Sequence, residues 1–237
     1  MTIELRDVRR EYLVGGQLVR ALDGVDLVLE GGGFVSIVGP SGAGKSTLLH
    51  LLGALDSPDS GEILFQGKEI GSLNDEAQSR FRRKQVGFVF QFFNLLPTMS
   101  AWENVAIPKL LDGVRMSKVK SDAIALLERV ELGNRAEHRP AELSGGQMQR
   151  VAVARALMMD PPLILADEPT GNLDSRTGAA VLELLADIAH DEGRDRMVVM
   201  VTHDVNAAES TDRTITLRDG RVQSDAKVEV LPTGTPG

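Results

Sequence analysis

The stretch Phe34-Val-Ser-Ile-Val-Gly-Pro-Ser-Gly-Ala-Gly-Lys-Ser-Thr-Leu-Leu-His-Leu-Leu52 predicts a buried strand, a glycine-rich loop and the start of a helix. The loop has the spacing G-x-x-x-x-G-K-S of a phosphate-binding Walker A loop. Its backbone N–H groups and the positive end of the helix would surround a polyphosphate. Lys45 would reach the β- and γ-phosphates, and the Ser46 hydroxyl would bind the Mg²⁺ that bridges them. The predicted nucleotide-binding residues of this loop are Ser41, Gly42, Ala43, Gly44, Lys45, Ser46 and Thr47.

Composition narrows the class of protein. The chain has 237 residues, of which 42% are hydrophobic, so it can bury one large α/β core with a subdomain. The net charge of −8 argues against a general polyanion binder, and no nucleic-acid partner is expected. The densest basic group, Arg80 to Lys84, is interpreted as a solvated helix end. The absence of cysteine excludes disulfides and thiolate metal sites.

Membrane insertion is not expected from this sequence. The first residues are charged and lack the apolar core of a signal peptide, and no apolar run approaches the roughly 18 residues of a membrane span. The chain would therefore act at a membrane only through a partner.

The N-terminal segments predict an antiparallel β layer. Residues 3–14 and 19–29 are β-branched and partly alternating, with a Gly-Gly turn between them. Tyr12 stands on this layer. Its ring could stack on a nucleotide base for about 1–3 kcal/mol, or it could simply pack against the layer, and the residues alone leave both interpretations open.

Residues 92–143 predict a helical insert between sheet strands. A helix is expected from Ser100, and a second, amphipathic one over residues 117–132. The loop before them carries four large apolar side chains, Phe92, Phe93, Leu95 and Leu96, with Trp102 close by. Either these side chains pack onto the helices that follow, or they line a groove for a partner helix.

A second potential anion site follows the insert. Ser144 and two glycines precede a long helix expected over residues 148–159, so free N–H groups and the positive helix end would be exposed there. The predicted ligand-binding residues of this site are Ser144, Gly145, Gly146 and Gln147.

Two further strands end in side chains suited to catalysis. The strand over residues 163–166 delivers Asp167, a predicted Mg²⁺ ligand, and Glu168, a predicted general base. Asp174 begins a helix expected over residues 175–190, for which it could simply be the cap. His203 follows the strand over residues 197–201, at the edge where open α/β sheets bind ligands.

Taken together, the motifs over residues 3 to about 222 resemble those of the ATPase subunit of an ABC transporter. The order Walker A, Leu-Ser-Gly-Gly-Gln, Leu-Ala-Asp-Glu-Pro-Thr, Thr-His-Asp carries the resemblance. By that resemblance Tyr12 stacks on adenine and Gln91 lies near Mg²⁺. Asp174 is the D-loop aspartate, and His203 contacts the γ-phosphate.

The resemblance also implies the architecture and the partners. The chain would be a single α/β P-loop ATPase domain with a mostly parallel core sheet. Residues 1–91 and 144–223 would form the core and β layer, residues 92–143 the helical subdomain, and residues 224–237 a loosely ordered tail. Two copies would bind ATP head to tail, and Ser144 to Gln147 of one copy, the signature segment, would close over ATP held by the partner's Lys45. A separate membrane permease would dock near residues 92–102, which implies a cytoplasmic position at the inner face of the cell membrane.

Two segments narrow the subgroup. Residues 90–97 and 168–174 are similar to the macrolide-export and lipoprotein-release group. The alternatives are a cell-division-type ATPase whose membrane partner transports nothing, and a soluble ABC ATPase of DNA repair or translation. The soluble class typically carries a coiled-coil insertion, zinc cysteines or a second ATPase, none of which this sequence contains.

Overall fold

Two sheets carry the fold in the computed structural model, which describes residues 1–227. The larger sheet has six strands in the order β10-β9-β3-β8-β7-β6, and all neighbouring pairs are parallel except β9 with β10. Its strands are β3 (Gly33–Val38), β6 (Val86–Phe90), β7 (Leu163–Asp167), β8 (Met197–Val201), β9 (Arg213–Arg218) and β10 (Arg221–Lys227). The prediction of a mostly parallel core sheet is confirmed.

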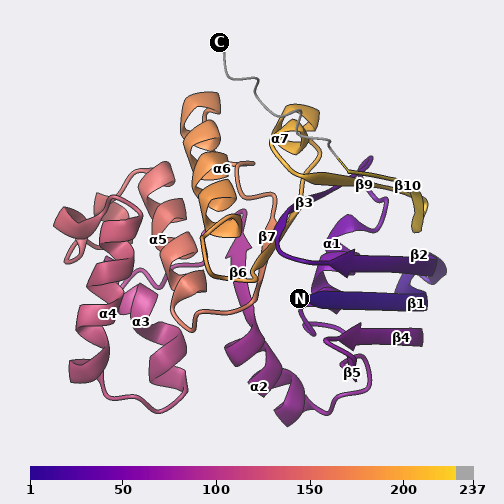
Figure 1. Cartoon of the computed structure of the whole chain (residues 1–237), viewed down its shortest axis with the longest axis horizontal. Coiled ribbons are helices and arrows are strands. Elements are labelled where there is room, and N and C mark those ends of the chain that lie inside the picture. The colour runs from indigo at the N-terminus through magenta and orange to yellow at the C-terminus, as the bar shows by residue number, and fades with distance from the viewer. Residues whose placement is uncertain (228–237) are drawn as a thin grey trace.

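The smaller sheet is antiparallel, as the N-terminal segments predicted. Its four strands lie in the order β2-β1-β4-β5. They are β1 (Thr2–Val14), β2 (Gln17–Glu30), β4 (Ser60–Phe65) and β5 (Lys68–Glu69). In Figure 1 this sheet lies on the opposite side of the core sheet from helices α3 to α5.

Seven α-helices and two short 3-10 helices complete the described residues. They are α1 (Lys45–Leu52), α2 (Asp75–Gln85), α3 (Ala101–Leu111), α4 (Met116–Arg129), α5 (Gly145–Leu157), α6 (Ser175–Ala189), α7 (Val205–Glu209), η1 (Gly133–Arg135) and η2 (Pro140–Glu142). Residues 92–143 contain helices and no strand, although their treatment as a separate subdomain stays a prediction. No helix within residues 1–227 has the length and apolarity needed to cross a membrane.

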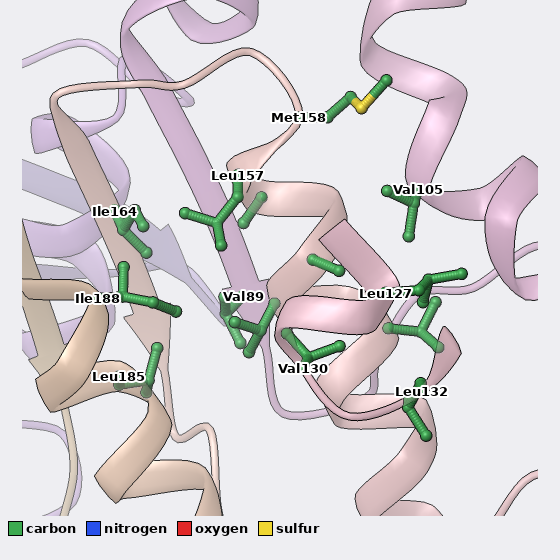
Figure 2. Packing of buried hydrophobic residues seen from close by; sticks show 14 of the residues in the cluster. Val89, Val105, Leu127, Val130, Leu132, Leu157, Met158, Ile164, Leu185 and Ile188 are labelled. Carbon is green, nitrogen blue, oxygen red and sulfur yellow. The ribbon is translucent and has the colours of Figure 1, made fainter. Parts of the chain in front are cut away.

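The core sheet has a hydrophobic core on each face, because successive residues of a strand point to opposite sides. On β8, Val198 and Met200 join the core beneath α3 to α6, while Met197, Val199 and Val201 join the core with α1 and the smaller sheet. Figure 2 shows the first of these cores, in which strand residues such as Val89 and Ile164 lie beside helix residues.

Several predicted boundaries are wrong. The helix expected over residues 148–159 begins at Gly145 and ends at Leu157. The helix expected over residues 117–132 ends at Arg129, and Glu131 takes a left-handed φ of 61°, which stops the helix. The tail expected from Ser224 is a strand up to Lys227, because β10 pairs with β9 and Arg213 forms an ion pair with Asp225. Backbone hydrogen bonds to β9 and this ion pair hold the strand in place, although its sequence has no apolar pattern. The rest of the predicted tail, 228–237, lies outside the described residues.

Candidate nucleotide site

The Walker A loop joins β3 to α1, as its sequence predicted. Gly44 caps α1 with a left-handed φ of 97°, and a Cβ atom there would lie 2.1 Å from the carbonyl oxygen of Ala21 on β2. Gly39 is equally restricted, since its Cβ would lie 2.1 Å from the carbonyl oxygen of Leu217. Only glycine lets the loop pass this close to two neighbouring strands.

Lys45 is held inside this loop. Its ammonium group donates to the carbonyl oxygens of Gly39 and Pro40, each at 2.9 Å, and the residue is 8% exposed. Ser41, Gly42 and Ser46 are exposed around it, whereas Ala43 is buried. Thr47 is half-buried on the first turn of α1. The loop thus surrounds a positive charge with exposed backbone at the start of a helix, which suits an anion.

The predicted catalytic side chains meet at one edge of the core sheet. In the strand register Ile37 pairs with Val201, Val201 with Asp167, and Asp167 with Phe90. The carboxyl ends of β3, β8, β7 and β6 are therefore level with one another. Each strand is followed by a predicted site segment, namely the Walker A loop, His203, Glu168 and Gln91.

Ser46 and Asp167 approach each other at this edge. The Ser46 hydroxyl donates to Oδ1 of Asp167 at 3.2 Å. No group of three or more histidine, cysteine or acidic side chains within residues 1–227 is arranged to hold a metal ion. Mg²⁺ commonly takes one or two carboxylates together with substrate phosphates and water. A hydroxyl and a carboxylate side by side fit the protein's share of such a site.

Glu168 and His203 form a second pair. Nδ1 of His203 lies 2.9 Å from Oε1 of Glu168, which is 18% exposed, while the histidine side chain is 72% exposed. Glu168 has a left-handed φ of 47°, and its N–H donates to the carbonyl oxygen of Val201 at 3.0 Å. This uncommon backbone conformation is fixed by β8, the strand that delivers His203.

Gln91 faces the loop that follows Glu168. Its Nε2 donates to Oδ1 of Asn172 at 3.4 Å, and Nδ2 of Asn172 donates to the carbonyl oxygen of Gln91 at 2.9 Å. The loop after β6 and the loop after β7 are therefore tied together at the surface.

Asp174 is the N-cap of α6. Its carboxylate accepts hydrogen bonds from the Thr177 hydroxyl at 2.6 Å and the Thr177 N–H at 3.0 Å. These bonds hold the pKa of Asp174 below its ordinary value, and the bond from the Thr177 hydroxyl contributes most. The capping role that the sequence allowed is confirmed, and the carboxylate stays exposed.

The signature segment occupies a hollow of its own. Ser144 caps α5 and forms a capping box with Gln147. A Cβ atom on Gly146 would lie 2.2 Å from Cγ2 of Thr177, so this glycine allows α5 to approach α6 closely. The hollow has a volume of about 250 Å³ and is lined by Glu131, Leu132, Ser144, Gly146, Gln147, Arg150 and Thr177. Gly145 begins the helix beside it.

Tyr12 is half-buried, and its ring is held from two sides. The Arg10 guanidinium lies 4.9 Å from the ring centroid, and the Tyr12 hydroxyl donates to Asp56 at 2.8 Å. The Walker A loop approaches β2 at Ala21, and Tyr12 pairs with Val19, two residues before Ala21 on that strand. The ring therefore lies on the layer that borders the loop.

A groove of about 530 Å³ opens beside Phe90, the residue that precedes Gln91. Its wall combines apolar side chains with three arginines, and it is lined by Leu55, Ser79, Arg82, Arg83, Val86, Gly87, Phe88, Phe90, Asn94, Ile107, Pro108, Leu111, Arg155, Ala156 and Met159. Arg82 and Arg83 donate to the carbonyl oxygens of Ala54 and Leu111, so they are not simply the solvated helix end that composition suggested. Burial lowers the pKa of Arg155, which donates to the carbonyl oxygen of Phe93 at 2.7 Å.

Both interpretations of the apolar segment at α3, core packing and contact with a partner, apply to different side chains. Trp102 is 7% exposed and Leu95 packs against the core, which is the packing alternative. Phe92 and Leu96 are 72% and 45% exposed and remain available to a partner.

The sequence did not reveal the side chains that contact and orient the predicted site residues. Thr177, Asn172, Arg10 and Asp56 contact predicted site residues but were assigned no role. Asn172 stood inside a motif already noted, and Arg10 stood two residues from Tyr12. Asp56 gave no local signal, because it lies 44 residues from the tyrosine that it contacts.

The comparisons with known proteins agree with this geometry. The sequence pattern of the ABC transporter family matches residues 22–171. The chain is 47% identical over 225 residues to the macrolide export ATP-binding/permease protein MacB of Chlorobaculum tepidum, covering 95% of this chain and 34% of the relative. It thus spans about a third of the length of such relatives. It is 45% identical to the lipoprotein-releasing system ATP-binding protein LolD of Shewanella sp. (strain MR-4), covering 95% of this chain and 96% of the relative.

A solved structure has the same fold over nearly the whole chain. It is the dimeric post-hydrolysis state of the ATP-binding cassette MJ0796 bound to ADP and Pi, with a TM-score of 0.87 and 41% identity. The match covers 97% of this chain and 100% of that one.

Proposed function

Because the chain belongs to the ABC transporter family of ATP-binding proteins, we propose that it hydrolyses Mg-ATP to drive a membrane subunit of the macrolide-export or lipoprotein-release type. Membership of the family makes it an ATP-binding ATPase domain. The proposal rests on one observation: the carboxyl ends of four neighbouring strands lie level with one another. The Walker A loop, Glu168, His203 and Gln91 follow these ends and converge there.

In this proposal the residues at this edge have different roles in binding and hydrolysing ATP. Lys45 and the loop N–H groups bind the phosphates, and Tyr12 offers the adenine base the ring face opposite Arg10. Ser46 and Asp167, with Gln91, would hold Mg²⁺, which when bound neutralises charge on the phosphates. Glu168 accepts the proton of the attacking water, and His203, already hydrogen-bonded to it, orients the carboxylate near the γ-phosphate.

Two copies complete the site in this proposal. The signature hollow of one copy, with Ser144 to Gln147 at a helix N-terminus, covers the ATP bound by the partner's Walker A loop, and Asp174 lies beside that interface. The support is that the chain carries two separate anion-binding elements, and that MJ0796 forms a dimeric cassette.

A complementation assay tests the shared site. Lys45→Ala and Ser144→Arg chains should each be inactive, because each spoils both sites of its own dimer. A mixed dimer keeps one site with an intact Lys45 and an intact Ser144, so mixing should restore activity. Failure of the mixture to exceed either variant alone would contradict a shared site.

The groove beside Phe90 is proposed as the docking surface for the membrane subunit. Its apolar wall and its three arginines suit an amphipathic helix that carries acidic residues, and exposed Phe92 and Leu96 extend the surface. Through that subunit the chain is held at the inner face of the membrane.

Capture of the partner tests this surface. Tagged Glu168→Gln chain, purified from solubilised membranes with ATP, should retain an integral membrane protein that has a large extracytoplasmic part. Leu111→Arg, in the groove, should lose it, whereas Leu18→Arg, on the β1–β2 hairpin and similarly exposed (60% against 69%), should keep it. Capture unaffected by Leu111→Arg, or capture of nucleic acid or ribosomes alone, would overturn the proposal.

A further inference from the structure

Gln149 is a polar side chain with no solvent exposure, surrounded on α5 by buried valines and alanines. A buried amide costs free energy unless hydrogen bonds compensate for its lost contact with water. An apolar side chain of the same length would suit this helix face better. The presence of an amide here therefore calls for a specific reason.

The amide group spans two loops. Its Nε2 donates to the carbonyl oxygen of Pro169 at 2.7 Å and, more weakly, to that of Phe90 at 3.4 Å. Both neighbours are acceptors, so the amide must present its NH₂ end to them. Its Oε1 has no hydrogen-bond partner within the described chain. Half of the amide's hydrogen-bonding capacity is unused, so the bonds to these two carbonyl groups account for the residue.

Both carbonyl groups adjoin proposed catalytic residues. Phe90 precedes Gln91 at the end of β6, and Pro169 follows Glu168 at the end of β7. We infer that Gln149 is a positioning residue, which fixes the backbone on one side of Gln91 and on one side of Glu168 at the same time. Its role is to hold the general base and the Gln91 side chain in register across the site.

A second contact also restricts these two loops. Asn172 and Gln91 exchange hydrogen bonds at the surface, as described above. The loop after Glu168 is thus tied to the loop after β6 by a buried amide and by an exposed one. Loss of the buried tie leaves the exposed one as the remaining side-chain link between these two loops, while the bonds of Glu168 to Val201 and His203 stay in place.

The inference rests on the proposed ATPase function, so the test begins with the wild-type chain. Absence of hydrolysis in the wild-type chain would defeat the proposed function, and the role of Gln149 with it. With an active wild type, Gln149→Met, which keeps the length of the side chain, should lower kcat about 10- to 100-fold and leave KM for Mg-ATP within about twofold. A kcat within twofold of wild type would overturn the inference.

A matched variant separates positioning from simple loss of stability. Val153 lies on the same helix and is equally buried, and its side chain has no hydrogen-bond donor for either loop carbonyl, so Val153→Ala is the control. It should lower Tm at least as much as Gln149→Met while kcat at 25 °C stays near wild type. If Val153→Ala lowers kcat as much as Gln149→Met does, the amide has only a structural role.

The variant Gln149→Glu adds a readout that stability alone would not move. A protonated glutamic acid can still donate one hydrogen bond to Pro169, whereas an ionised one repels both carbonyl groups. Since burial favours the neutral form, the ratio of its kcat to that of wild type should rise as the pH falls from 8 to 6. A ratio that is flat with pH would count against the positioning role.

Discussion

His203 and Glu168 meet across two adjacent strands, with Nδ1 of the histidine 2.9 Å from Oε1 of the carboxylate. Because the histidine orients the proposed base, His203→Ala should lower turnover while ATP binding is retained. A hydrogen bond to a charged group is worth about 1.5–3 kcal/mol, which corresponds to about 10- to 150-fold in rate. Steady-state ATPase assays measure this effect, with His138→Ala as the control. Equal turnover in the two variants would remove His203 from the site.

Lys45→Ala should weaken nucleotide binding. The ammonium group would contribute a charge-assisted contact to phosphate worth about 1.5–3 kcal/mol, so Kd should rise about 10- to 150-fold. Lys68→Ala, on exposed β5, is the matched control and should bind like the wild type. Fluorescent-nucleotide titration measures both, and an unchanged Kd for Lys45→Ala would reject its role with phosphate.

Gly146→Ala should destabilise the protein and impair turnover, because the new Cβ would lie 2.2 Å from Cγ2 of Thr177. Overpacking of this kind costs about 1–3 kcal/mol. Thr177→Ser removes that methyl group but keeps the hydroxyl that binds Asp174. The double variant should therefore recover most of the loss in urea unfolding and in ATPase assays. No recovery would show that the two side chains do not limit each other.

Asp56 should contribute stability that depends on pH. Burial alone would raise its pKa, but hydrogen bonds from Tyr12 and Ser57 and the charge of Arg10 outweigh it, so the pKa lies below its ordinary value. Asp56→Asn should then be less stable than wild type at pH 7. The difference should shrink as the pH falls below about 4, because the carboxylate takes up its proton there in the unfolded chain and only at lower pH in the folded one. Urea unfolding from pH 7 to pH 3 measures it, and a difference as large at pH 3 as at pH 7 would contradict this origin.

The local motifs were predictable because short-range constraints define them. Gly44 and Lys45 are recognisable at fixed spacing, and Glu168 follows a short apolar run that is typical of a buried strand. The contacts that hold these residues were not predictable. Gln149 and Pro169 lie 20 residues apart, and their contact exists only once α5 packs on the sheet.

The prediction of a loosely ordered tail from Ser224 was wrong for a different reason. Strand β10 is polar and shows no alternation of apolar residues that would predict a strand. It is held in place by pairing with β9 and by the ion pair between Arg213 and Asp225.

The most direct test of the account measures ATP binding and ATP turnover together in Glu168→Gln. The variant should bind ATP within about twofold of wild type and hydrolyse it about 10²- to 10⁴-fold more slowly, which is the usual contribution of a positioned base. Glu183→Gln, on the exposed face of α6, should match the wild type in both measurements. If Glu168→Gln hydrolyses ATP at the wild-type rate, Glu168 is not the general base and the proposed mechanism is wrong.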